Sequence, residues 1–90
     1  MPQAHPQRNP KLMKARVIVT LKNGVLDPQG KAIEHALASL GVEGLASLRQ
    51  GKVFDIELTG SDRDKARESL AAACEKLLAN TVIENYAIEV

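Results

Sequence analysis

A change of hydrophobic period across residues 23–31 most constrains how this chain can fold. Before it, residues 15–22 (ARVIVTLK) alternate in polarity and are rich in β-branched side chains, which predicts a strand with one face formed by Ala15, Val17, Val19 and Leu21. After it, apolar side chains recur at the helical spacing of Ile33, Ala36, Leu37 and Leu40. Asp27 suits a helix N-cap, Pro28 suits the first helical position, and Gly41 predicts the helix end. The chain therefore opens with a strand followed by a helix.

The second half repeats this alternation of periods. Residues 45–50 and 53–59 are short apolar-bearing runs separated by Gly51, which predicts a hairpin whose core face carries Phe54, Ile56 and Leu58. Ser61, with Asp64 three residues later, resembles a capping box and predicts a second helix start. The stripe of that helix is Ala66, Leu70, Ala73, Cys74 and Leu77. A last strand is expected over residues 82–90.

The predicted order is β-α-β-β-α-β. With right-handed crossovers, this order predicts an α/β (α+β) two-layer sandwich of the ferredoxin-like type. We expect a four-stranded antiparallel sheet with both helices on one face.

The N-terminal residues differ in composition from the rest. Residues 1–13 carry Pro2, Pro6 and Pro10 among polar side chains without apolar periodicity, so we expect a disordered, Pro-rich N-terminal extension, followed by a single domain over residues 14–90. Two origins of the extension stay open, a native segment and a vector-derived one that precedes a start at Met13. A folded unit this small has a marginal core, which favours a partner or self-association.

Charge and cysteine content narrow the class of function. The first fourteen residues hold three basic side chains and no acid, which leaves nine basic against eleven acidic side chains in the remainder. A nucleic-acid module normally shows the opposite balance. One cysteine, Cys74, excludes an internal disulfide and a Cys-x-x-Cys site. The chain shows no signal-peptide pattern and no apolar run of membrane-spanning length, so we expect a cytoplasmic protein.

The Asp27-Pro28-Gln29-Gly30 turn is the most informative candidate site. Glycine inside the first helical turn costs roughly 0.5–1 kcal/mol relative to alanine, and such a cost often marks the close approach of another backbone or a ligand. Simple helix initiation explains the other three residues equally well.

Other chemistry-bearing residues favour structural roles. His35 is expected on a helix surface and Cys74 in the core, and neither has a visible catalytic or metal-binding partner. Residues 49–54 are similar to an RNA-recognition signature, but Phe54 has the core parity while Asp55 and Glu57 occupy the open face. We expect no catalytic, cofactor-binding or metal-binding residues in this chain.

Three ordered blocks resemble the PurS family, the small subunit of multi-subunit phosphoribosylformylglycinamidine (FGAM) synthase. They are residues 26–33 (LDPQGKAI), 48–52 (LRQGK) and 77–86 (LLANTVIENY). The resemblance spans residues 14–90, and Thr81 stands where many members have proline.

The resemblance implies a non-catalytic subunit of an enzyme of de novo purine biosynthesis, a ligase and glutamine amidotransferase complex. That complex converts formylglycinamide ribonucleotide to its amidine with ATP, Mg and glutamine, none of which this chain is expected to bind. The expected partners are the glutaminase subunit, the large synthetase subunit and a second copy in a homodimer or higher oligomer, without nucleic acid or membrane. The chain is expected to bridge the two larger subunits and to support ammonia transfer.

Loops are the expected contact regions, because they can adapt to partners without disturbing a core. The candidate subunit-interface residues are Asp27, Pro28, Gln29, Gly30, Arg49, Lys52, Asn80 and Thr81. The candidate self-association face is the open side of the sheet, with Arg16, Ile18, Val53 and Asp55. Two other functions stay open: an amino-acid-sensing module of the same βαββαβ order, and an RNA-binding module.

Overall fold

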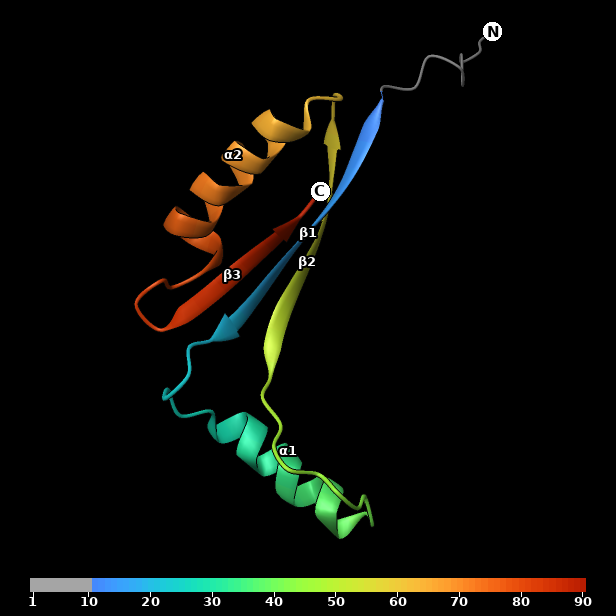
Figure 1. Cartoon of the computed structure of the whole chain (residues 1–90), viewed down its shortest axis with the longest axis vertical. Helices are drawn as coiled ribbons and strands as arrows, with labels where there is room; N and C mark the ends of the chain where they lie inside the picture. The colour runs from blue at the N-terminus through green and yellow to red at the C-terminus, as the bar shows by residue number, and fades with distance from the viewer. Residues whose placement is uncertain (1–10) are drawn as a thin grey trace, which may run out of the picture.

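Residues 11–90 are described by the computed structural model, and they form one antiparallel sheet with two helices. The elements follow the order β1 (Leu12–Leu21), α1 (Pro28–Ser39), β2 (Gly51–Thr59), α2 (Arg63–Ala73), a π-helical turn η2 (Cys74–Leu78) and β3 (Glu84–Glu89). Within these residues the sheet has three strands in the order β2-β1-β3 (Figure 1). The prediction of an α+β chain with two helices is therefore confirmed.

The N-terminal boundary lies earlier than expected. Residues 1–10 of the predicted extension lie outside the described residues. Leu12 and Met13 belong to β1, where they pair with Thr59 and Leu58. The strand thus includes two residues that we assigned to the extension, because Met13 continues the apolar alternation of β1 and is buried.

The central strand β1 has the predicted alternation. Its buried side chains are Met13, Ala15, Val17 and Val19. Val17 lies opposite Phe54 of β2 and Ile88 of β3, so the three strands form one apolar face. The predicted core parity of β2 is also confirmed, because Phe54, Ile56 and Leu58 are half-buried while the residues between them are exposed.

Helix α2 covers this apolar face. Ala66 and Leu70 are buried, and Cys74 lies in a core cluster with Val17 and Val19. The helix starts one residue later than predicted: Asp62 is the N-cap, and its carboxylate accepts the Lys65 N–H at 3.0 Å. Asp and Ser are equally good caps, so the local sequence could not distinguish Ser61 from Asp62.

The π-helical turn changes which leucine faces the core. Ala79 N–H donates to the Cys74 carbonyl at 3.1 Å, an i→i+5 bond that accommodates one more residue than an α-helical turn. Leu78 consequently packs against the core cluster, whereas Leu77 is 81% exposed. The prediction that Leu77 continues the buried stripe was wrong because it assumed a constant helical period.

The expected fourth strand is absent from the described residues. Residues 45–50 form no strand, and Gly51 is the first residue of β2 rather than a hairpin turn. Side chains from the preceding helix region bind this backbone: Leu48 N–H donates to Glu34 Oε2 at 2.7 Å and Gln50 N–H donates to Asp27 Oδ2 at 2.9 Å. These bonds satisfy the donors that a strand would have used.

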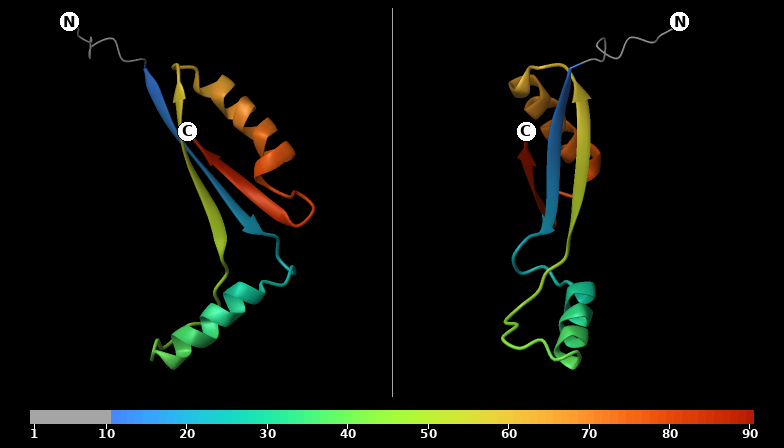
Figure 2. Two further views of the ribbon diagram at one scale, coloured as in Figure 1. Left: turned by 180° about the vertical axis from the view of Figure 1, so that it is seen from behind. Right: turned by 90° about the vertical axis from the view of Figure 1, so that its right-hand side faces the viewer.

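The expectation that both helices cover one face of the sheet was also wrong. Helix α1 lies beyond the end of the sheet, where β1 ends and β2 begins (Figures 1 and 2). We call residues 22–50 the arm, since they leave the sheet with α1 and return to it. The predicted apolar stripe of α1 is largely open, with Ile33 39% and Leu40 79% exposed.

Candidate subunit interface at the arm junction

Asp27 joins the two ends of the arm. It is the N-cap of α1, as predicted, and its Oδ1 accepts the Gly30 N–H at 2.9 Å. Its other oxygen, Oδ2, accepts the Gln50 N–H at 2.9 Å from the returning chain. The hydrogen bond from the Gln50 N–H has the largest effect on the pKa of Asp27 and lowers it below its usual value. The Gly30 N–H and the positive charge of Arg49 lower this pKa further. The carboxylate therefore stays ionised near neutral pH and holds both chain segments.

Gly30 is required by packing inside the chain. It is buried, and an added Cβ would lie 2.5 Å from Asp27 Oδ2 and 3.1 Å from the Leu48 carbonyl oxygen. The sequence left two explanations open at this turn, simple helix initiation and the close approach of another backbone or a ligand to Gly30. The backbone that approaches here is Leu48 of the same chain.

Arg49 fastens the returning segment to the loop after β1. Its Nη2 donates to the carbonyl oxygens of Val25 at 2.8 Å and Lys22 at 3.2 Å. The side chains of Gln29 and Gln50 also hydrogen-bond to each other. These contacts join charged guanidinium and carboxylate groups to backbone atoms. They connect the start of α1 to the loop before it and to the start of β2. We call this connected unit the arm junction.

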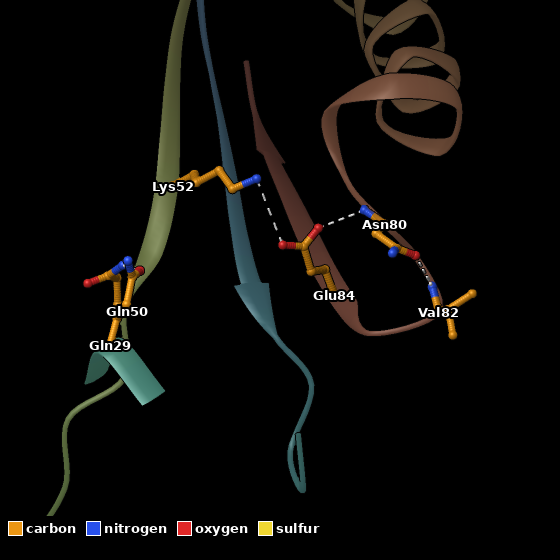
Figure 3. Close-up of polar contacts among 6 residues, drawn as sticks. All are labelled: Gln29, Gln50, Lys52, Asn80, Val82 and Glu84. Carbon is orange, nitrogen blue, oxygen red and sulfur yellow. Dashed lines mark hydrogen bonds and ion pairs between the residues drawn. The ribbon is translucent and has the colours of Figure 1, made fainter. Parts of the chain in front are cut away.

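A second polar cluster lies beside the junction, at the start of β3. Glu84 accepts the Asn80 N–H at 2.6 Å through Oε1, and its Oε2 lies 4.0 Å from Lys52 Nζ (Figure 3). Asn80 Oδ1 in turn accepts the Val82 N–H at 3.2 Å, which closes the turn before β3. Thr81 is half-buried in the same turn. Glu84 thus connects two of the predicted interface segments, which are distant in sequence.

The structure gathers most of the predicted interface residues at one end of the sheet. A depression there is lined by Val19, Leu21, Asp27, Gln29, Gln50, Gly51, Lys52 and Glu84. Asn80 reaches this depression only through Glu84, and Pro28 is exposed at the start of α1. The sequence prediction missed Gln50 and Glu84. Both fall inside the blocks of resemblance, but only their tertiary contacts indicate a role.

The predicted self-association residues lie together on the side of the sheet opposite α2, where Arg16, Val53 and Asp55 are exposed and Ile18 is half-buried. Arg16 and Asp55 are cross-strand neighbours joined by an ion pair of 2.8 Å between Nε and Oδ1. Ile18 lies opposite Val53, which is 57% exposed. The patch thus mixes apolar and charged groups as expected, and its use in self-association stays a prediction.

The remaining polar and nucleophilic groups have structural surroundings. Cys74 is fully buried, and burial raises the pKa of its thiol. Tyr86 Oη donates to Glu75 Oε2 at 2.8 Å, a bond that raises the pKa of the phenol and ties β3 to η2. His35 is exposed on α1. Among residues 11–90, no group of three or more His, Cys, Asp or Glu side chains could hold a metal ion.

The RNA-binding alternative can be compared with this geometry. Phe54 packs against the core cluster on the α2 side, so it does not provide the stacking surface that an RNA-recognition sheet presents on its open face. No helix in the described part of the chain is long and apolar enough to cross a membrane.

Comparison with known proteins identifies the family. The PurS family, described as phosphoribosylformylglycinamidine (FGAM) synthase, matches residues 14–90. The PurS subunit of Bacillus subtilis is 47% identical over 79 residues, which are 88% of this chain and 93% of the relative.

Solved structures agree with this assignment. The Thermotoga maritima PurS crystal structure has a TM-score of 0.81 and 34% identity, and the match covers 94% of this chain and 98% of the other. A chain of the PurLQS structure from Thermotoga maritima has a TM-score of 0.80 at 34% identity, with 88% of this chain and 96% of the other covered. By sequence and by fold, this chain belongs to the PurS family of FGAM synthase subunits.

Proposed function

We propose that this chain is the small, non-catalytic PurS subunit of FGAM synthase, an enzyme complex of de novo purine biosynthesis. The observation that carries the proposal is the family match over residues 14–90, which includes the arm and both polar clusters. The match to a chain of the PurLQS structure supports an assembly with glutaminase and synthetase subunits.

In this proposal the chemistry belongs to the larger subunits. The complex uses ATP, Mg and glutamine to convert formylglycinamide ribonucleotide to its amidine, and this chain binds no cofactor of its own. Ammonia released by a glutaminase must reach the synthetase site before it is protonated, since ammonium is not a nucleophile. A small subunit that seals the contact between the two larger subunits would improve this transfer. The complex is proposed to work in the cytoplasm.

The arm junction supplies a firm contact region for such a role. Asp27 and Arg49 connect the start of α1 to the returning chain through hydrogen bonds to backbone atoms. The exposed groups around them, Pro28 and Lys52, can then meet a partner at defined positions. Interfaces gain affinity when loops are ordered before binding, because less conformational entropy is lost.

Amidine synthesis by the synthetase and glutaminase subunits, with and without this chain, tests the proposal. Glutamine and then ammonium serve as the nitrogen source. We expect the chain to raise the rate with glutamine and to change it little with ammonium. A rate increase with both sources would make the chain an organiser of the synthetase, and no increase with either source, with all subunits folded, would refute the proposal.

A matched pair of lysine variants tests the contact region. Lys52→Ala removes a charge beside the junction. Its contact with Glu84 is long, at 4.0 Å, and the Lys52 side chain is 62% exposed, so this ion pair contributes little to folding. Lys14→Ala removes another exposed charge, near the other end of β1. We expect Lys52→Ala to weaken the glutamine-dependent rate increase more than Lys14→Ala. Equal effects would remove Lys52 from the proposed contact region.

A further inference from the structure

Asn23 and Gly24 form the middle of an exposed turn between β1 and α1 (Figure 1). The Val25 N–H donates to the Lys22 carbonyl oxygen at 3.1 Å, which closes the turn. Gly24 has a φ of +87°, in the left-handed region that glycine adopts without strain. The turn therefore exposes an asparagine directly before a glycine nitrogen that no side chain of its own residue shields.

This pair has the arrangement for a reaction of the asparagine side chain with the backbone. The nitrogen of Gly24 can attack the side-chain carbonyl carbon of Asn23, Cγ, and form a succinimide ring. Glycine favours the attack because it has no Cβ to crowd the reacting atoms, and nothing lies within 4 Å of the place that a Gly24 Cβ would take. The bond that closes the turn uses the Val25 N–H, so it does not engage the attacking nitrogen.

The other asparagines lack one of these features. Asn9 precedes a proline, which has no N–H that could react. Asn80 precedes the β-branched Thr81, and its side-chain oxygen is already hydrogen-bonded in the turn before β3. Asn85 lies within β3, where pairing with β1 holds its backbone extended. Asn23 is therefore the asparagine whose surroundings favour the reaction.

We propose that Asn23 is a site of spontaneous deamidation, and that its isoaspartyl product loosens the arm junction. As the bond from the Gly24 nitrogen to Cγ forms, the side-chain amide leaves as ammonia and takes the proton of the attacking N–H. Water then opens the ring: its hydroxyl joins one ring carbonyl carbon, the bond from that carbon to the ring nitrogen breaks, and the nitrogen regains a proton. Opening at the backbone carbonyl gives isoaspartate, in which the chain runs through Cβ and Cγ. Opening at the other carbonyl gives aspartate.

Isoaspartate changes the turn that Arg49 holds. Arg49 Nη2 donates to the carbonyl oxygens of Lys22 at 3.2 Å and Val25 at 2.8 Å, one on either side of the reacting pair. The isoaspartyl link adds one backbone carbon between these two carbonyl groups, so their spacing no longer fits a single guanidinium nitrogen. Without these bonds, the returning segment depends on the bond of the Gln50 N–H to Asp27 beside them.

Ageing the full chain in mildly alkaline buffer, where the attacking nitrogen loses its proton more readily, tests the reaction. An isoaspartyl methyltransferase with labelled S-adenosylmethionine counts isoaspartate, and mass spectrometry of peptides locates it. We expect the wild-type chain to gain isoaspartate with time and Asn23→Ser to lose nearly all of this gain, with Asn80 and Asn85 as internal controls. A folded chain that gains none while its denatured form does, or a gain chiefly at another asparagine, would overturn the assignment of the site.

Hydrogen exchange tests the effect on the junction. Ion exchange isolates the deamidated chains, which carry one more negative charge. In these chains we expect the amides of Gly30 and Gln50, which Asp27 binds, to exchange several times faster, while that of Val17 in the core exchanges as in the unreacted chain. Freshly prepared Asn23→Asp is the matched control, because it has the same new charge without the extra backbone carbon, and it should exchange as the unreacted chain does. Unchanged exchange in the deamidated chains, or equal acceleration in Asn23→Asp, would overturn the proposed effect of isoaspartate.

Discussion

Replacing Gly30 with alanine should destabilise this chain, although alanine is the better helix former. The helical preference favours alanine by roughly 0.5–1 kcal/mol. Against it, the new Cβ would lie 2.5 Å from Asp27 Oδ2, 2.8 Å from Asp27 Cγ and 3.1 Å from the Leu48 carbonyl oxygen. Overpacking of this kind costs about 1–3 kcal/mol. The carboxylate cannot move aside freely, because the N–H groups of Gly30 and Gln50 hold it.

The expected net loss for Gly30→Ala is therefore roughly 1 kcal/mol in the free energy of unfolding. For a domain of this size, such a loss lowers the melting temperature by about 4–8 °C. Thermal unfolding followed by circular dichroism measures it. All samples need the same protein concentration, since self-association would shift the melting temperature by mass action.

The same substitution in an Asp27→Ala background isolates the cause. Without the carboxylate, the two closest of these three contacts are gone and the Leu48 carbonyl oxygen remains, at 3.1 Å. Gly30→Ala should then be neutral or stabilising, and the two changes should be strongly non-additive. A melting temperature at or above the wild-type value for the single variant would refute the reasoning. An equal loss of stability from Gly30→Ala in the wild-type and Asp27→Ala chains would also refute it.

Three further predictions follow from the packing and the pKa shifts. Because the pKa of Asp27 is lowered in the folded chain, its contribution is fully present above the unfolded pKa of about 3.9. That contribution is lost as pH falls through the folded value. The melting-temperature difference between wild type and Asp27→Asn should thus shrink below about pH 4, and a constant difference down to pH 2 would contradict this. Cys74 should react with a thiol reagent far more slowly in the folded chain than in denaturant, because it is buried and its pKa is raised. Equal labelling rates would place it at the surface. Leu78→Ala should lower the free energy of unfolding by about 2 kcal/mol or more, whereas Leu77→Ala, at an exposed position, should change it by less than about 0.5 kcal/mol. Chemical denaturation compares the two, and the reverse order would mean that η2 has the phase of an ordinary α-helix.

Local patterns in the sequence predicted most of the secondary structure. The period-two alternation around Val17 and the cap at Asp27 depend on residues a few positions apart, so they can be inferred without tertiary contacts. Errors arose where a distant side chain changed the local outcome. Residues 45–50 were predicted as a strand because they form a short apolar-bearing run before Gly51, but Glu34 and Asp27 bind the backbone N–H groups of Leu48 and Gln50.

The candidate site was predicted in pieces rather than as a whole. The blocks around Asp27, Arg49 and Asn80 were each recognised from their residues. Their proximity depends on Glu84, which joins Asn80 to Lys52, and on Gln50, which joins β2 to Asp27. The contacts of Lys52 with Glu84 and of Asp27 with Gln50 have no signal in the local sequence, because a helix separates the partners in each pair.

The sequence alone determined that this chain has β-α and β-α-β segments, an amphipathic α1 and membership of a recognisable family. Only the tertiary structure decided where α1 lies. An apolar stripe such as Ile33, Leu37 and Leu40 has the same pattern whichever surface covers it, because hydrophobic burial has no direction. The position of α1 is set by hydrogen bonds of Asp27 and Arg49 to remote backbone atoms, which hold the arm away from its own sheet.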